Sequence, residues 1–114
     1  KTAFKIPYQI APIDVSIFPL MKKPELVSLA KDIKLELEKR FIVDYDLAGT
    51  IGKRYLRSAM QGVPFALTID YDSLEDKTVT IRDRDTTKQK RITIDELPTI
   101  LDQLIQGEKT FKEL

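Results

Sequence analysis

The chain has 114 residues, of which 42% are hydrophobic and 32% are charged, and its formal net charge is +1. This composition is typical of one globular domain that is large enough to bury a hydrophobic core without disulfides or structural metals. The chain contains neither cysteine nor histidine, which excludes disulfides, zinc–cysteine sites, thiol nucleophiles and Ser-His-Asp triads.

The first part of the chain, to residue 70, alternates between strand and helix patterns. Strand segments show alternating or continuous apolar residues, and helical segments repeat an apolar residue every three or four positions. In chain order the sequence predicts a strand over 13–18, a helix over 24–37, a strand over 41–45, a helix over 51–61 and a strand over 64–70. Thr50 is placed to cap the second helix, and Gly62 is placed to end it. Strands separated in this way by helices should be parallel and joined by right-handed crossovers.

The pattern changes in the second part of the chain. Residues 77–83 and 88–94 form two strand segments, and too few residues separate them for a parallel crossover, so they should form an antiparallel hairpin. An apolar helical stripe then extends from 97 to 105, with Asp95 as its expected cap and Pro98 in its first turn. The sequence therefore predicts an α/β fold of the order βαβαβββα, a five-stranded mixed β-sheet with three α-helices.

Basic residues are concentrated in and around the hairpin. Residues 77–93 contain six lysines and arginines against two aspartates, and residues 53–57 contain three more basic side chains. Acidic residues gather instead just before the hairpin, at 70–76. One part of the surface should therefore be positive although the total charge is nearly neutral.

The period of a strand decides where the hairpin arginines should point. Val79 and Ile81 should face the core, so Arg82 and Arg84 should project together from the opposite face of the sheet. Guanidinium groups bind phosphates and base edges with paired donors and stack on bases, which favours RNA as a partner. Ion pairing with the two neighbouring aspartates is the alternative.

Two further motifs raise enzyme hypotheses. Asp-Tyr-Asp occurs after an apolar strand at 44–46 and again at 70–72, which faintly resembles the nucleophile loop of haloacid dehalogenase phosphatases. Such a phosphatase also needs a lysine, further magnesium ligands and a larger fold, so we interpret these aspartates as turn residues at strand ends. Residues 48–54 lack the Gly-Lys-Ser/Thr order of a P-loop, although the helix N-terminus there could hold one phosphate. We predict no catalytic residue and no metal ligand.

The start of the chain, which begins with lysine instead of methionine and has an extended entry segment between Pro7 and Pro12, suggests a piece of a longer protein. No apolar run approaches the roughly 18 residues of a membrane span, and the first residues lack the apolar core of a signal peptide. We therefore expect a soluble, cytoplasmic protein with no membrane partner. Residues 1–12, with Pro7 and Pro12, are expected to be a linker from a missing upstream domain, and residues 13–114 the folded domain.

Three ordered segments resemble the C-terminal anticodon-binding domain of class II aminoacyl-tRNA synthetases. They are "APIDVSIFPL" at 11–20, "DLAGTIGKRYLRSAMQGVPFALTID" at 46–70 and "TVTIRDRDTTKQKRITIDELP" at 78–98. The likeness is closest to glycyl-tRNA synthetases of the archaeal and eukaryotic type and extends from about Ile10 to the C-terminus. The fold of that family, a five-stranded mixed sheet with three helices, agrees with the fold predicted above.

The resemblance implies which residues should face RNA. By motif position these are Arg82, Asp83, Arg84, Asp85 and Thr86 in the hairpin, Gly49, Ile51, Gly52 and Arg54 around the start of the second helix, and Phe18 and Pro19, at the edge of the sheet in the family fold. Lys88 is a candidate phosphate contact. One departure is that Ala59, Met60 and Gln61 stand where these synthetases usually carry an acidic Asp-Glu pair.

The resemblance also implies a function and its partners. The domain should grip the tRNA anticodon stem-loop, while a catalytic domain of the same polypeptide, in a homodimeric parent, activates glycine with ATP and Mg²⁺. No cofactor is expected in this domain itself. The alternative is a noncatalytic nucleic-acid-binding domain of a DNA polymerase accessory subunit or a regulator, because a fold alone does not define a function.

Overall fold

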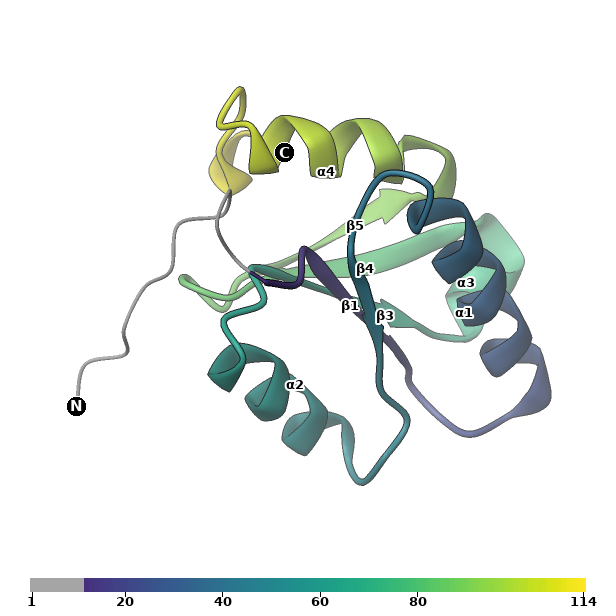
Figure 1. Ribbon diagram of the computed structural model, residues 1–114. Coiled ribbons are helices and arrows are strands. Elements are labelled where there is room, and N and C mark those ends of the chain that lie inside the picture. The colour runs from purple at the N-terminus through teal and green to yellow at the C-terminus, as the bar shows by residue number, and fades with distance from the viewer. Residues whose placement is uncertain (1–11) are drawn as a thin grey trace.

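The computed structural model describes residues 12–114, which form a five-stranded mixed sheet with strand order β2-β1-β3-β4-β5 (Figure 1). The strands are β1 (Val15–Pro19), β2 (Val43–Tyr45), β3 (Phe65–Ile69), β4 (Thr78–Asp83) and β5 (Gln89–Thr93). The α-helices are α1 (Pro24–Leu37), α2 (Ile51–Met60), α3 (Tyr71–Asp76) and α4 (Leu97–Ile105), and the 3-10 helices are η2 (Ile94–Glu96) and η3 (Phe111–Glu113). The predicted α/β class, the mixed sheet and the hairpin are confirmed.

The topology places α1 and α2 on opposite faces of the sheet. β1 pairs in parallel with β2 on one side and with β3 on the other, whereas β4 and β5 are antiparallel to their neighbours. The crossover from β1 to β2 and the crossover from β2 past β1 to β3 therefore run in opposite directions across the sheet, and crossovers of the same hand then lie on opposite faces. Figure 1 shows α2 on one side of the strands and α1 and α4 on the other.

The hydrophobic core lies almost entirely on the side of α1 and α4. The strands contribute Val15, Ile17, Phe65, Leu67, Ile69, Val79, Ile81 and Ile92, and the two helices contribute Leu26, Ala30, Ile33, Leu37, Leu97, Leu101, Leu104 and Ile105. On the opposite face, α2 meets the sheet through a more polar layer, in which the hydroxyls of Ser16 and Ser58 share a buried hydrogen bond of 2.8 Å. The two faces of the sheet are thus covered to very different extents.

The predicted signals that bound α2 are confirmed. Thr50 Oγ1 accepts a hydrogen bond of 3.3 Å from the backbone N–H of Lys53, which satisfies one of the free donors at the start of the helix. After Met60, the last residue of the helix, Gly62 adopts φ +79°, a conformation that glycine takes without a steric penalty. Local sequence therefore fixes both ends of the helix α2, which covers this face.

Two local predictions are wrong. The structure has a fourth α-helix, α3, which has six residues and a capping box between Asp70 and Ser73; it has too few apolar residues to show helical periodicity. Asp95 does not cap α4, because residues 94–96 form η2 and Glu96 occupies the cap position. Pro98 does lie in the first turn of α4, as expected.

The linker predicted over 1–12 lies outside the described residues, except for Pro12, and stays a prediction. Within the described part of the chain, no helix combines the length and the hydrophobicity that a membrane crossing requires.

An ion pair between Asp70 and Arg91 joins three elements. The Asp70 carboxylate accepts hydrogen bonds of 3.0 Å from Nη1 and 2.6 Å from Nη2 of Arg91. It also accepts a hydrogen bond of 3.1 Å from the backbone N–H of Ser73. It thereby connects the end of β3, the start of α3 and β5. The hydrogen bonds from Arg91 hold the pKa of Asp70 below its ordinary value of 3.8, although partial burial opposes this shift.

We expect Asp70→Ala to lower the free energy of unfolding by about 1–2 kcal/mol, because it removes both the cap of α3 and the ion pair, and Asp70→Asn to lower it by less. Because folding lowers the pKa of Asp70, its carboxylate stabilises the fold above pH 3.8, and this contribution is lost as the pH falls through the folded pKa. Urea unfolding of wild type and Asp70→Asn, measured at successively lower pH, should show that the difference between their free energies of unfolding decreases. A difference independent of pH would contradict this role of the ion pair.

Candidate nucleic-acid interface

The strands β4 and β5 are not covered by α2 on the face that they share with it. In the registers of β3, β4 and β5, Arg82 lies opposite Ala66 and Gln89, and Thr80 lies opposite Thr68 and Arg91, so these side chains share one face. We call the β4–β5 part of it the open face, which consists of Thr78, Thr80, Arg82, Gln89, Arg91 and Thr93. All six are half-buried or exposed. A polar strip of sheet is thus accessible beside α2.

Tyr55 of α2 positions Arg82 at the border of the open face. The Arg82 guanidinium carbon lies 4.5 Å from the centroid of the Tyr55 ring, a favourable cation–π contact. The Tyr55 hydroxyl shares a hydrogen bond with Thr68, and the ring packs edge-on against the buried ring of Phe18, with centroids 5.2 Å apart. Burial raises the pKa of Tyr55, so its hydroxyl stays protonated at neutral pH. A fixed aromatic ring therefore supports this guanidinium.

A cavity of about 340 Å³ lies between α2 and the hairpin. Tyr55, Leu56 and Ala59 of α2 form one wall, Pro64 lies before β3, and Arg82, Arg84 and Thr87 come from the hairpin; Gly52 also contributes. The lining is mostly apolar, with arginines from the hairpin side. The cavity thus adjoins the open face and includes three residues that the sequence predicted to face RNA: Gly52, Arg82 and Arg84.

The residues after β4 form a turn in which Asp83 and Thr86 are partners. The Asp83 side chain is buried and accepts hydrogen bonds of 3.0 Å from the backbone N–H and 2.8 Å from the hydroxyl of Thr86. Thr87 follows with φ +59°. Lys88 is exposed on the same turn. In this structure Asp83 and Thr86 shape the turn, and their contacts with RNA stay predictions.

Arg84 does not project freely beside Arg82, so that part of the prediction is wrong. It follows the last residue of β4, and only 8% of its side chain is exposed. Its Nη1 donates a hydrogen bond of 2.8 Å to the carbonyl of Gly62, and its Nε donates 2.9 Å to Asp85. The period of an extended strand could not predict this direction, because the acceptor lies at the end of α2.

The predicted residues around the start of α2 have mixed positions. Arg54 is buried, and it donates to the carbonyls of Pro19 and Gly49, so it connects β1 with the loop before α2. Gly49 adopts φ +71°, and Ile51 begins the helix. Phe18 and Pro19 are the last two residues of β1, as expected, and both are buried. These contacts are structural.

The Asp-Tyr-Asp segments also have structural partners. Asp46 accepts a paired interaction from Arg57, with Nε and Nη2 donating 2.9 and 3.0 Å, and Asp70 caps α3 as described above. Burial, with a smaller contribution from Asp46, raises the pKa of Asp44. Among residues 12–114 no three carboxylates are grouped closely enough to hold a metal ion. The turn interpretation of these aspartates accounts for Asp46 and Asp70.

The chain matches the family model of the anticodon-binding domain over residues 14–104. It belongs to the anticodon-binding domain family. The domain is also similar to the crystal structure of the RNA-binding domain of threonyl-tRNA synthetase from Cryptosporidium parvum, with 28% identity and a TM-score of 0.77, covering 87% of this chain and 25% of that one.

Relatives of this anticodon-binding domain include several glycine–tRNA ligases. Identity is 50% with that of Thermococcus gammatolerans, 44% with that of Corynebacterium glutamicum and 53% with that of Clostridium kluyveri. The matches cover 95%, 94% and 85% of this chain but only 19%, 23% and 20% of those proteins. The chain therefore spans about a fifth of the length of these relatives.

Tyr55 is the residue of this anticodon-binding domain that sequence reasoning missed. It follows Arg54 on α2, and its hydroxyl also lies 3.5 Å from Oε1 of Gln89 on β5. The available signal was an aromatic residue inside a strongly polar helix, which marks a position that packs on the sheet. Its neighbours could not be predicted, because they come from β1, β3, β4 and β5.

Tyr55→Phe should lower the free energy of unfolding by about 1 kcal/mol, because the partly buried hydroxyl pair with Thr68 is lost. The ring remains, so the packing against Phe18 and Arg82 should persist. Tyr71→Phe is the matched control, because Tyr71 is 43% exposed. Urea unfolding of the three proteins measures this difference. Equal stability of Tyr55→Phe and wild type would show that the hydroxyl pair does not stabilise the domain.

Proposed function

We propose that this domain holds the anticodon stem-loop of a glycine tRNA on the open face, next to α2. The observation that carries this proposal is the Arg82 guanidinium, which is stacked on Tyr55 at the border between exposed strands and a cavity. Single-stranded RNA loops are recognised by aromatic rings and guanidinium planes that stack on unpaired bases and by donors that reach base edges. Both kinds of group meet at this place.

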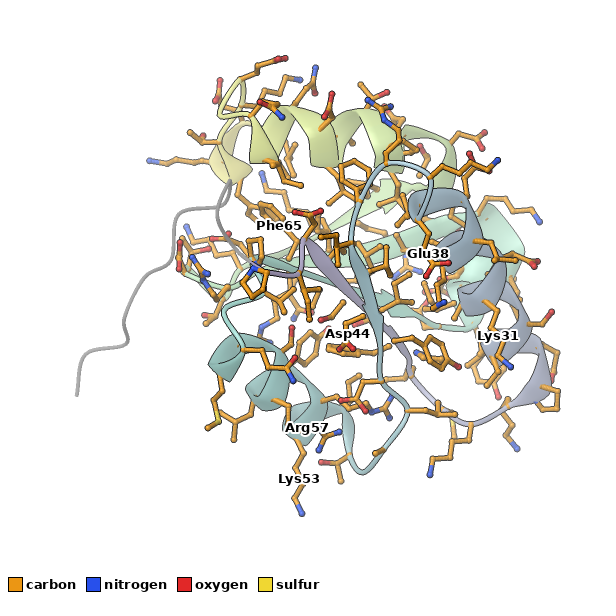
Figure 2. The ribbon with its side chains drawn as sticks, viewed as in Figure 1. Lys31, Glu38, Asp44, Lys53, Arg57 and Phe65 are labelled. Carbon is orange, nitrogen blue, oxygen red and sulfur yellow. The ribbon has the colours of Figure 1, made fainter. Side chains whose placement is uncertain are left out.

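Two exposed lysines, which follow the cavity-lining residues Gly52 and Thr87 in the chain, support the same orientation of the RNA. Lys88 lies on the hairpin turn, and Lys53 extends from α2 into solvent (Figure 2). Phosphates of a loop that crosses the cavity would meet these two charges. Such contacts supply affinity without sequence preference, whereas Arg82 would supply discrimination between bases.

We propose that the cavity between α2 and the hairpin receives one unstacked base of the loop. Its volume, about 340 Å³, lies at the lower end of the range of about 300–1,000 Å³ that is usual for ligand pockets. Leu56 and Ala59 offer an apolar wall to the face of a base, and Arg82 offers donors to its edge. The cavity wall includes Ala59, one of the residues that depart from the acidic pair usual in the family.

We infer that the parent protein is a glycine–tRNA ligase in the cytoplasm, because several curated relatives carry that name over nearly the whole of this chain. The relatives favour this parent over the polymerase accessory subunit. Its catalytic domain would lie in the part of the polypeptide that these matches do not cover, would use ATP and Mg²⁺, and would act as a homodimer. The domain described here would position the tRNA for that catalytic domain.

Arg82→Lys should reduce discrimination between a stem-loop with a glycine anticodon and one with altered second and third anticodon bases, by about 1–3 kcal/mol, because it keeps the charge but loses the planar pair of donors. Lys88→Ala should weaken binding to both loops about equally. It should also reduce the slope of the logarithm of the binding constant against the logarithm of the salt concentration by about 0.7–0.9. Binding titrations of the 114-residue chain at several salt concentrations measure both effects.

Lys31→Ala is the control for these variants, because Lys31 is exposed on α1, on the other side of the sheet (Figure 2). It should leave affinity and salt slope nearly unchanged. A wild-type domain whose binding to the stem-loop does not depend on salt, or a Lys31→Ala effect as large as that of Lys88→Ala, would refute the open face as the RNA-binding surface.

A further inference from the structure

Arg84 connects the hairpin turn to the carboxyl end of α2. Its side-chain Nη1 donates a hydrogen bond of 2.8 Å to the carbonyl of Gly62, and its backbone N–H donates one of 2.9 Å to the carbonyl of Pro64. Gly62 and Pro64 belong to the short connection between α2 and β3. Two hydrogen bonds from one residue therefore hold the turn against this connection.

The guanidinium of Arg84 already has protein acceptors. Besides the hydrogen bond to Gly62, its Nε and Nη2 donate hydrogen bonds of 2.9 and 3.4 Å to the two carboxylate oxygens of Asp85. Only 8% of the side chain is exposed. Two-donor recognition of a base edge needs neighbouring donors that are free to turn toward the RNA, and here Asp85 occupies that pair.

The helix α2, which ends at this connection, and the turn lie on opposite sides of the cavity. Leu56 and Ala59 of α2 line it from one side, and Thr87 of the turn lines it from the other. Hydrogen bonds between Asp83 and Thr86 fix the turn that carries Thr87 internally. The link through Arg84 is therefore placed to determine the separation of the two walls.

We propose that Arg84 is a positioning residue of the RNA site, which sets the width of the cavity that receives a base without itself contacting that base. The Asp85 carboxylate orients the guanidinium, and the carbonyl of Gly62 accepts its hydrogen bond. The proposal rests on the proposed function, because the cavity matters to recognition only if this domain binds the stem-loop. It assigns Arg82 and Arg84 different roles although both line the same cavity.

Asp85→Asn separates positioning from direct contact, because the two roles predict effects of opposite sign. If Arg84 positions the turn, the weakened ion pair should loosen it, and affinity for the matched stem-loop should fall by about tenfold. If Arg84 contacts RNA, the released guanidinium should bind more tightly. Asp72→Asn controls for the removed charge, because Asp72 is an exposed acid that acts electrostatically on Arg91 of the open face.

Arg84→Gln is the second variant, because it removes the charge and its shorter side chain, which ends at about the position of the arginine Nε, no longer reaches the carbonyl of Gly62. Positioning predicts an unchanged salt slope, faster hydrogen exchange at the backbone amide of residue 84 than in wild type, and lower affinity. Direct contact predicts a salt slope reduced by about 0.7–0.9. All variants are compared with wild type by stem-loop titration, thermal unfolding and amide exchange.

Tighter binding by Asp85→Asn than by Asp72→Asn, a reduced salt slope for Arg84→Gln, or unchanged affinity in both Arg84→Gln and Asp85→Asn would overturn the positioning role. Failure of the proposed function would look different, because wild type itself would then not bind the stem-loop. If Arg84→Gln does not fold, the sign of the Asp85→Asn effect still decides.

Discussion

The uneven covering of one sheet is the constraint on which the site depends. α1 and α4 bury one face of the sheet under a continuous hydrophobic core, whereas α2 covers the other face over β1 and β3. The strands β4 and β5 come after the last α2-side crossover, so on that face α2 reaches only their border, where Tyr55 contacts Arg82 and Gln89. Polar and cationic residues can stand there without the penalty of burial, and the hydrogen bonds between the strands hold their backbone.

α2 connects the three segments that carry the family resemblance. Arg54 binds the end of β1, Arg57 binds the loop after β2, and Tyr55 supports Arg82 of β4. The helix is therefore a structural support for the site and also one wall of its cavity. This explains why much of the segment around the start of α2 is occupied by internal contacts, although the resemblance places it toward RNA.

Patterns with a short period were sufficient to predict the sheet, the hairpin and the inward direction of Val79 and Ile81, because alternation along a strand is a local property. The direction of Arg84 and the buried state of Asp83 could not be predicted, because they depend on the carbonyl of Gly62 and on the conformation of the turn. α3 was missed because six residues with one partly buried leucine carry no helical period. Tyr55 was missed because its partners lie on four different strands.

An RNA footprint by NMR tests most directly whether the α2-side face of the sheet is the RNA-binding surface. An isotope-labelled domain would be titrated with a stem-loop that carries a glycine anticodon, and changes in amide and arginine side-chain resonances would be mapped onto the structure. The account predicts that the largest changes fall on residues 52–60 and 80–89, with the outer surfaces of α1 and α4 unaffected. Changes centred on α1 or α4, with the Arg82 and Tyr55 resonances unmoved at saturation, would contradict it.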